Sequence, residues 1–283
     1  MKRATLASVL IASILVIAKL IAWWRSDSMA VLSSLTDSFF DLVTSALNLV
    51  AVRYALKPAD DDHRFGHTSI EDIAGLAQCA FISASMLIII LQSLERLANP
   101  QPLVHEIWGM GVSVLGMFLT TALVAYQTYV ARRTGSLIVA SDRLHYAGDI
   151  AFNIGVFFAL FASAYFGWVW ADPAVALVIA AFVLWSSRSI GIRAFHNLMD
   201  REMPEDEKTK IDAVLQRFPE LHGVHHLKTR YAGIKPFIQM HADIDATLGF
   251  REAHAIIDRL EQALLDVFPG AEIIIHPDPV EPA

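Results

Sequence analysis

Six long apolar stretches constrain this chain more than any other feature of its sequence. They lie near residues 4–24, 29–52, 73–94, 107–131, 138–166 and 169–190. A helix needs about 20 residues to cross the hydrocarbon core of a bilayer, and a spanning segment must satisfy its own backbone hydrogen bonds. The pattern therefore predicts a polytopic α-helical membrane protein with six transmembrane helices. The last stretch contains Pro173 and has the shortest strongly apolar run, so its assignment depends on the other five.

The positions of the cationic side chains predict the orientation of these helices. Lysine and arginine gather at alternate loops and ends, around residues 2–3, 53–64, 132–133 and 188–193. Cytoplasmic loops carry the excess of positive charge, so both termini are expected in the cytoplasm. Hydrophobic residues make up 55% of the chain and charged residues 18%, which agrees with membrane lipid as a partner. The net charge of −7 and the scattered cations argue against a nucleic-acid partner.

The composition changes abruptly after His196, and residues 201–283 are expected to form a separate cytoplasmic domain behind a transmembrane domain of residues 1–200. A charged linker leads to Pro204 and an acidic first turn, which are typical of a helix start. Residues 222–233 and 236–245 are predicted strands, residues 250–268 a helix, and residues 271–279 a short strand ended by prolines. The order α-β-β-α-β indicates a small two-layer α+β domain.

Two pairs of polar residues interrupt the apolar helices at a spacing of four. Asp37 and Asp41 lie in the second stretch, and His145 and Asp149 lie in the fifth. Residues four apart share one helix face, and ionised groups at membrane depth are costly unless they are paired, solvated or functional. One imidazole and three carboxylates suit a tetrahedral zinc-like ion. Because three carboxylates in an empty site cannot all stay ionised, metal binding should expel protons, which predicts antiport.

A simpler interpretation is that these groups are only hydrogen-bonded inside the helical bundle, or that they pair with Lys19 and Arg143. The two matched pairs favour a functional site over this alternative. Cys79 is the single cysteine of the chain, so a disulfide framework and a multi-cysteine zinc site are both excluded. Metal chemistry in this chain must therefore use histidines and carboxylates.

Two further groups of histidines and acidic residues lie outside the apolar stretches. The loop PADDDHRFGHTSIED offers Asp60, His63 and His67, with Asp61, Asp62 and Glu71 as additional candidates. A solvated acidic loop explains that spacing equally well. The C-terminal domain contains a second candidate group, which only the fold can bring together: His225, His241, His254, His276 and Asp278. Spacing alone favours ordinary surface histidines for this group.

The paired motifs D-x3-D and H-x3-D, the loop PADDDHRFGH and the closing IIIHPDP resemble the cation diffusion facilitator family, in particular its bacterial zinc-transporting and ferrous-iron efflux members. The resemblance implies a homodimeric zinc/proton antiporter of the bacterial inner membrane and no enzyme. Zn2+ would be both the substrate and a structural or regulatory ligand, Cd2+ is a further expected substrate, and Fe2+ is left open.

The same resemblance assigns three metal sites. A transport site would comprise Asp37, Asp41, His145 and Asp149. A loop site would comprise Asp60, His63 and His67. A binuclear site in a metallochaperone-like domain that helps hold the dimer would comprise His225, His241, His254, His276 and Asp278.

Two positions depart from the pattern of similar proteins. Ser69 stands where relatives often carry a lysine of an inter-subunit charge interlock, and His226 stands where relatives have an acidic residue.

Two other function classes compete with transport. An intramembrane aspartyl protease would use a pair of aspartates, but the second aspartate of the first pair and His145 are surplus to such a dyad. A metal-sensing receptor would not need ligands such as Asp149 at membrane depth.

Overall fold

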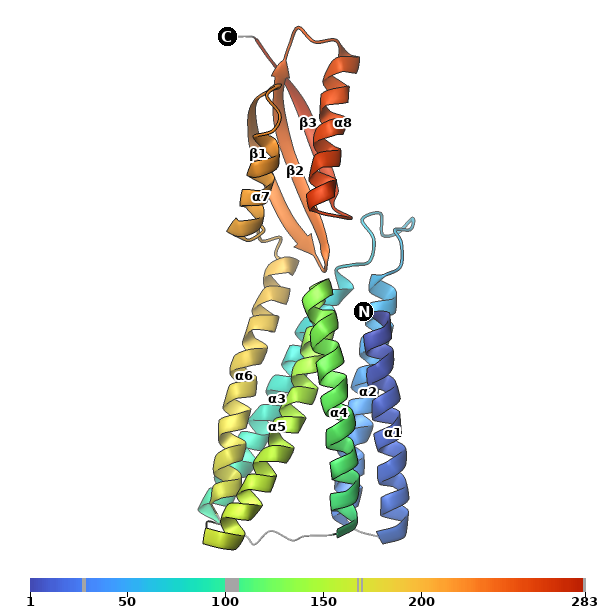
Figure 1. Cartoon of the computed structure of the whole chain (residues 1–283), viewed down its shortest axis with the longest axis vertical. Coiled ribbons are helices and arrows are strands. Elements are labelled where there is room, and N and C mark those ends of the chain that lie inside the picture. Colours follow the sequence, from blue (N-terminus) through green and yellow to red (C-terminus); the bar gives the residue numbers. More distant parts are fainter. Residues whose placement is uncertain (27–28, 100–106, 167, 169, 282–283) are drawn as a thin grey trace. The chain divides into compact units, whose positions relative to one another are not determined.

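The computed structural model describes the backbone, and most side chains, of residues 1–26, 29–99, 107–166, 168 and 170–281. The chain forms two compact units, Met1–Phe195 and His196–Ala283. The first unit consists of six long helices (Figure 1). They are α1 (Lys2–Ser26), α2 (Met29–Ala55), α3 (Ile70–Ala98), α4 (Ile107–Thr134), α5 (Leu137–Phe166) and α6 (Ala171–Leu198). Each of them overlaps one of the predicted apolar stretches.

Five helical segments among the described residues are long and apolar enough to cross a membrane. They are Lys2–Arg25, Ser34–Ala55, Ile70–Ala98, Val114–Thr134 and Pro173–Leu198. The segment Pro173–Leu198 supports the sixth predicted span, residues 169–190, which has the shortest strongly apolar run in the sequence. Helix α5 is not in this set, and its first half carries Asp142, Arg143 and Asp149. The structure thus supports a helical membrane domain, whereas α5 as a sixth span stays a prediction.

Large apolar side chains cover the outside of the helical unit. Trp24 and Trp185 are 81% and 71% exposed, and Phe118 is 73% exposed. An exposed apolar surface of this kind would be unfavourable in water. It is the surface expected of helices that face lipid tails.

The second unit contains α7 (Glu205–Leu215), β1 (Leu221–Ala232), β2 (Lys235–Asp245), α8 (Phe250–Val267) and β3 (Glu272–Val280), which confirms the predicted order of elements. The sheet order is β1-β2-β3, with β1 antiparallel and β3 parallel to β2. Ile238 and Met240 of β2 are buried with Ile211 of α7 and Leu260 of α8, so both helices cover the same face of the sheet. The opposite face, to which His241 of β2 points, is left for polar side chains.

The predicted last strand, residues 271–279, is confirmed as β3 (Glu272–Val280). Strand β3 continues through Pro277 and Pro279, which align with Ala242 and Ile244 of β2. A proline cannot donate a backbone hydrogen bond, and it is tolerated in an edge strand where its nitrogen points away from the neighbouring strand. The two prolines are two residues apart, so their nitrogens point to the same open edge, while His276 and Asp278 bond to β2.

Candidate metal centres

The structure brings together three of the four predicted transport-site residues. Asp41 of α2 and His145 and Asp149 of α5 offer ligand atoms that all lie within 4.8 Å of one another. His145 Nε2 lies 2.9 Å from Asp41 Oδ1 and 3.8 Å from Asp149 Oδ2. The His145 side chain is only 13% exposed, so this cluster lies inside the bundle. One imidazole nitrogen therefore faces two carboxylates.

Asp37 lies one helical turn before Asp41 and is not part of this cluster. Its side chain is exposed, although it interacts electrostatically with Asp41 and with Lys19 of α1. Lys19 Nζ donates hydrogen bonds to Ser34 O and Ser38 Oγ of α2, at 3.0 and 2.7 Å. The Lys19 ammonium is therefore held by hydrogen bonds to α2. From there it interacts electrostatically with the carboxylates of Asp37, Asp41 and Asp149.

Asp142, one turn before His145 on α5, belongs to a separate buried hydrogen-bond network. Its carboxylate is 1% exposed and lies 2.7 Å from Ser8 Oγ of α1, 3.0 Å from Asn48 Nδ2 of α2 and 2.6 Å from Gln127 Nε2 of α4. Buried carboxylates need such donors because they have left water. Asp142 thus joins four helices at the end of the metal-binding segment of α5.

Substitution of Asp142 tests this network. Asp142→Ala should remove the acceptor that Ser8, Asn48 and Gln127 share. The Ser8 hydroxyl can still donate to the Ala4 carbonyl and the Gln127 amide to Ser8 Oγ, so the loss should be largest at Asn48, at about 1–3 kcal/mol for a buried group left unsatisfied. We expect a lower melting temperature in detergent, with a smaller loss for Asp142→Asn, which keeps one acceptor oxygen. Thr121→Ala on α4 is the control, because within the described part of the chain that hydroxyl bonds to the backbone carbonyl of Met117. A wild-type melting temperature for Asp142→Ala would contradict the role of the network.

The predicted loop residues also lie together. Asp60, His63 and His67 form a second cluster of candidate ligands. His67 Nε2 lies 3.4 Å from Asp60 Oδ2, and the two imidazole rings are 4.5 Å apart. A hydrogen bond from Lys57 holds the pKa of the Asp60 carboxyl well below its usual range, so this carboxylate stays ionised. A metal ion at this cluster would compete with the Lys57 ammonium for Asp60.

The additional loop candidates do not join the loop cluster. Asp61 pairs with Arg64 at 2.9 Å. Glu71 is buried at the start of α3 and accepts a hydrogen bond from Ser136 Oγ. Ser69, at the position of the missing lysine, precedes α3 and makes no side-chain capping hydrogen bond. The loop cluster is therefore limited to the three residues that the family resemblance implies.

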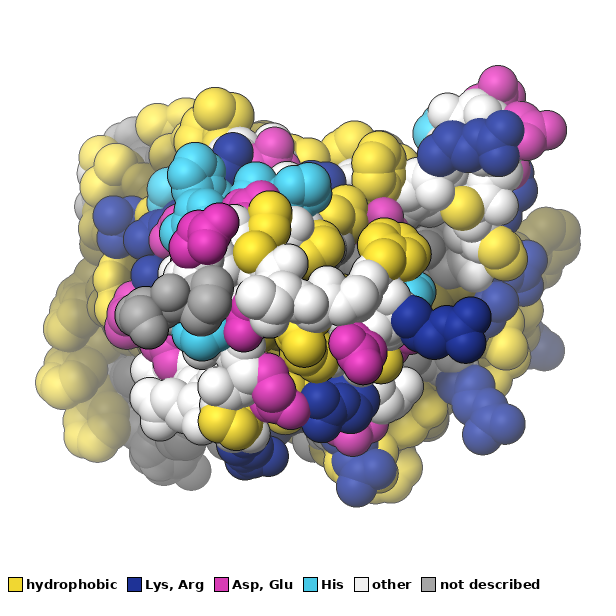
Figure 2. All heavy atoms as spheres, turned by 90° about the horizontal axis from the view of Figure 1, so that it is seen from above, with side chains coloured by type: hydrophobic (Ala, Val, Ile, Leu, Met, Phe, Trp, Pro, Cys, Tyr) yellow, Lys and Arg dark blue, Asp and Glu magenta, His cyan; other side chains and the backbone are white. Residues whose placement is uncertain are grey.

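A third cluster lies on the sheet of the second unit. His225, His241 and His276 occupy one row across β1, β2 and β3, and Asp278 lies two residues beyond His276 on the same face. Asp278 Oδ2 lies 2.8 Å from His241 Nδ1 and 3.3 Å from His225 Nε2, and Asp278 Oδ1 lies 3.2 Å from His276 Nε2. Figure 2 shows histidine side chains gathered beside acidic ones on one side of the molecule. Asp278 is the common partner of three imidazoles.

Hydrogen bonding from His241 lowers the pKa of Asp278, so the shared carboxylate is ionised at neutral pH. Asp243 adds a second carboxylate that the sequence analysis missed, since its Oδ1 lies 3.4 Å from His225 Nδ1. The sequence contained a signal for this residue. Asp243 lies two positions after His241, so both side chains point to the polar face of β2. Gly223 leaves the space that this carboxylate uses, since a Cβ there would lie 2.5 Å from Asp243 Oδ2.

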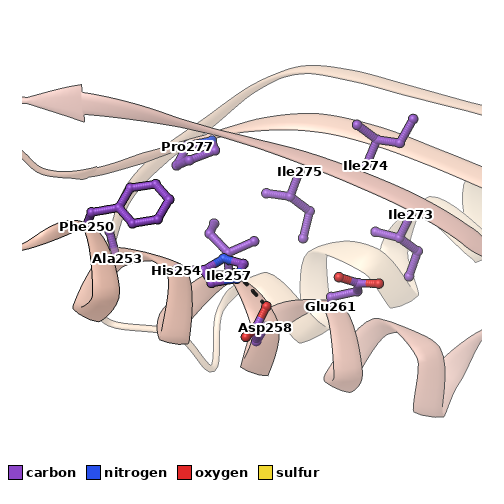
Figure 3. Close-up of a pocket in the computed structure, with 10 residues that line it drawn as sticks. All are labelled: Phe250, Ala253, His254, Ile257, Asp258, Glu261, Ile273, Ile274, Ile275 and Pro277. Carbon is purple, nitrogen blue, oxygen red and sulfur yellow. Dashed lines mark ion pairs between the residues drawn. The ribbon is translucent and has the colours of Figure 1, made fainter.

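The structure does not bring His254 into this cluster. His254 lies on α8, which covers the opposite face of the sheet. It pairs with Asp258 at 3.7 Å and stacks on Phe250, with ring centres 6.0 Å apart. These residues line an apolar pocket of about 440 Å³ between α8 and β3, together with Ile275 (Figure 3). The sheet itself separates His254 from the other predicted ligands of the same chain.

The fold and these clusters define a multi-pass helical membrane protein that carries candidate metal ligands among its helices and in an appended α/β domain. Residues 5–199 match the cation efflux transmembrane domain, and residues 203–280 match the cytoplasmic domain of cation efflux proteins. The chain therefore belongs to the cation efflux family. This membership favours transport over the protease and receptor alternatives.

Similar proteins cover nearly the whole chain. The cation-efflux pump FieF of Yersinia enterocolitica is 42% identical over 278 residues, which are 98% of this chain and 92% of that protein, and FieF of Yersinia pestis is 41% identical over the same length. A structure of CzrB is 38% identical and covers 28% of this chain and 98% of that one, with a TM-score of 0.27. The metal-bound C-terminal domain of CzcD from Thermotoga maritima is 30% identical and covers 27% of this chain and 94% of that one, with a TM-score of 0.26.

Proposed function

We propose that this chain exports Zn2+ in exchange for protons through the cluster of Asp41, His145 and Asp149. The observation that carries the proposal is that α2 and α5 bring one imidazole nitrogen and two carboxylates within 4.8 Å of one another inside a helical bundle. Asp37, one turn from Asp41, would supply the fourth ligand of a tetrahedral ion. Imidazole with carboxylates suits Zn2+, and we expect Cd2+ to be accepted as well.

The hydrogen bond between His145 and Asp41 supports proton coupling. One of the two atoms must donate, so the 2.9 Å contact holds a proton between His145 Nε2 and Asp41 Oδ1. That nitrogen is also the one that faces Asp149, and it can bind a metal only after the proton has left. Metal entry would therefore release at least this proton. Its return after metal leaves would complete an alternating-access cycle.

The other two clusters would bind metal without conducting it. We propose that the loop cluster and the sheet cluster are zinc sites of structural or regulatory use, in a homodimer of the bacterial inner membrane with both termini in the cytoplasm. The match to the family's cytoplasmic domain supports a role of this domain in the dimer. His254 could bind the same metal as His241 only if it came from a second copy of the chain, because the sheet lies between them.

Proton coupling is tested by flux into proteoliposomes that contain a zinc-sensitive dye. With zinc equal on both sides, an imposed pH gradient should drive zinc toward the side with more protons, because protons leaving that side exchange for metal. Dissipating the gradient with a protonophore should stop this movement. A potassium gradient with valinomycin at equal pH is the control for membrane potential alone. Zinc flux that ignores the pH gradient would contradict the antiport proposal while leaving cation efflux intact.

A further inference from the structure

His226 has an unusual backbone conformation at a break in the sheet. The pairing of β1 with β2 shifts register between His225 and Lys228, and His226 has a φ of 52°. Residues with a Cβ rarely adopt positive φ, and where they do, the surrounding structure must hold them there. In a regular strand His225 and His226 would point to opposite faces. The irregularity instead places both imidazole rings beside His241.

The three rings form a nearly equilateral triangle. Ring centres are 4.9 Å apart for His225 and His226, 5.1 Å for His226 and His241, and 5.2 Å for His225 and His241. A tetrahedral zinc ion with Zn–N bonds of about 2.0–2.1 Å holds the centres of two ligand imidazoles about 5 Å apart. The ring-centre spacing of all three pairs is compatible with three imidazoles around one metal ion. Among the described residues of the sheet, only His225, His241 and Asp278 already offer ligand atoms that all lie within 4.8 Å of one another, so the His226 ring would have to turn to bring a nitrogen to the same ion.

The neighbouring carboxylates complete such a site. Asp278 Oδ2 lies 3.3 Å from His225 Nε2, which is close to the separation of about 3.3 Å between two ligand atoms of one tetrahedral zinc ion. The other nitrogen of His225, Nδ1, faces Asp243 Oδ1 at 3.4 Å. A carboxylate behind a ligating histidine is the common way in which proteins fix the ring and its tautomer. Asp243 is thus placed to orient His225.

We propose that His226 is a metal ligand, so that His225, His226, His241 and Asp278 bind one Zn2+ with three nitrogens and one carboxylate. This inference rests on the proposed role of the sheet cluster as a metal site and deepens it. Nitrogen donors favour zinc over the harder Mn2+, which prefers carboxylates and water. His226 therefore makes the cytoplasmic site of this chain more selective for zinc-like ions.

Simple ring packing is the alternative, because aromatic rings also pack at such distances. A glycine at position 226 separates the two explanations, since glycine adopts positive φ without strain. If His226 is a ligand, His226→Gly should keep or raise the melting temperature of the metal-free protein while weakening zinc binding. If His226 serves only for packing, stability should fall and zinc affinity should stay the same.

The experiment is an equilibrium zinc titration of the full chain in detergent, in a background with Asp149→Asn and His67→Asn to remove ligands from the other two clusters. We expect about a 10- to 100-fold larger Kd for zinc in His226→Gly and His226→Ala, with a smaller change for Mn2+. His222→Ala, an exposed histidine of β1 outside the cluster, should bind zinc like the parent.

Two outcomes would overturn different claims. If His241→Ala abolishes zinc binding in this background but His226→Ala and His226→Gly keep the parental Kd, His226 is not a ligand and the sheet cluster is still a metal site. If none of the three substitutions changes zinc binding, the sheet cluster does not bind zinc, and the proposal for His226 fails with it.

Discussion

Asp41→Ala should reduce zinc flux into proteoliposomes by at least about a hundredfold, to the level of empty vesicles. The substitution removes a ligand on α2 and breaks the 2.9 Å hydrogen bond between Asp41 and His145. Loss of a supporting group outside a metal's ligand shell already costs about 10- to 100-fold in affinity, and loss of a ligand should cost at least as much. Asp149→Ala should have the same effect, because Asp149 faces the same imidazole nitrogen.

The measurement is the initial rate of dye response at several zinc concentrations, with equal amounts of each protein reconstituted. Thr44→Ala is a matched control on α2, since among the described residues the Thr44 hydroxyl bonds to the carbonyl of Phe40 and lies outside the cluster. The melting temperature of each variant shows whether lost flux reflects lost folding. A folded Asp41→Ala protein that transports zinc at the rate of the Thr44→Ala control would refute the assigned transport site.

His145→Asp should shift the preference between zinc and manganese by about tenfold or more toward manganese. His145 is the single nitrogen donor of the transport cluster, and replacing it with a carboxylate makes all donors oxygen. Ligand type and geometry decide selectivity among divalent metals more than raw affinity does. The extra carboxylate also raises the proton load of the empty site, so zinc transport should need a higher external pH.

Selectivity is measured as the ratio of initial zinc, cadmium and manganese fluxes in the same vesicles. His222→Asp makes the same chemical change on an exposed surface and should leave the ratio unaltered. An active His145→Asp protein with an unchanged zinc-to-manganese ratio would show that His145 does not set selectivity. Such a result would also weaken the four-ligand assignment that includes Asp37.

Much of this architecture follows from local patterns in the sequence. Apolar runs of about 20 residues specify membrane helices because a lipid environment leaves the backbone few alternatives. The alternation from Ile238 to Ile244 specifies β2 and the face that it buries, which the structure confirms. A spacing of four places Asp41 with Asp37, and His145 with Asp149, on single helix faces. The edge position of β3, where its two prolines are tolerated, is not visible in the local pattern.

Only the tertiary structure decided which of these faces meet. Asp41 and His145 are 104 residues apart, and helix packing alone places their side chains in contact. The same packing assigns Asp142 to a hydrogen-bond network instead of the metal cluster, although it shares a polar segment with His145. Local sequence sets the direction of a side chain relative to its own helix or strand. It does not set the neighbour that the side chain finds.

The sheet domain shows the same division between local and long-range information. The sequence by itself determined that histidines are concentrated there and that the order of elements is α-β-β-α-β. The tertiary structure decided that His254 lies behind the sheet, and that the irregularity after His225 turns His226 toward His241. The physical reason is that side-chain alternation is a property of one strand, whereas a register shift and the covering of a face arise from pairing and packing between elements distant in the chain.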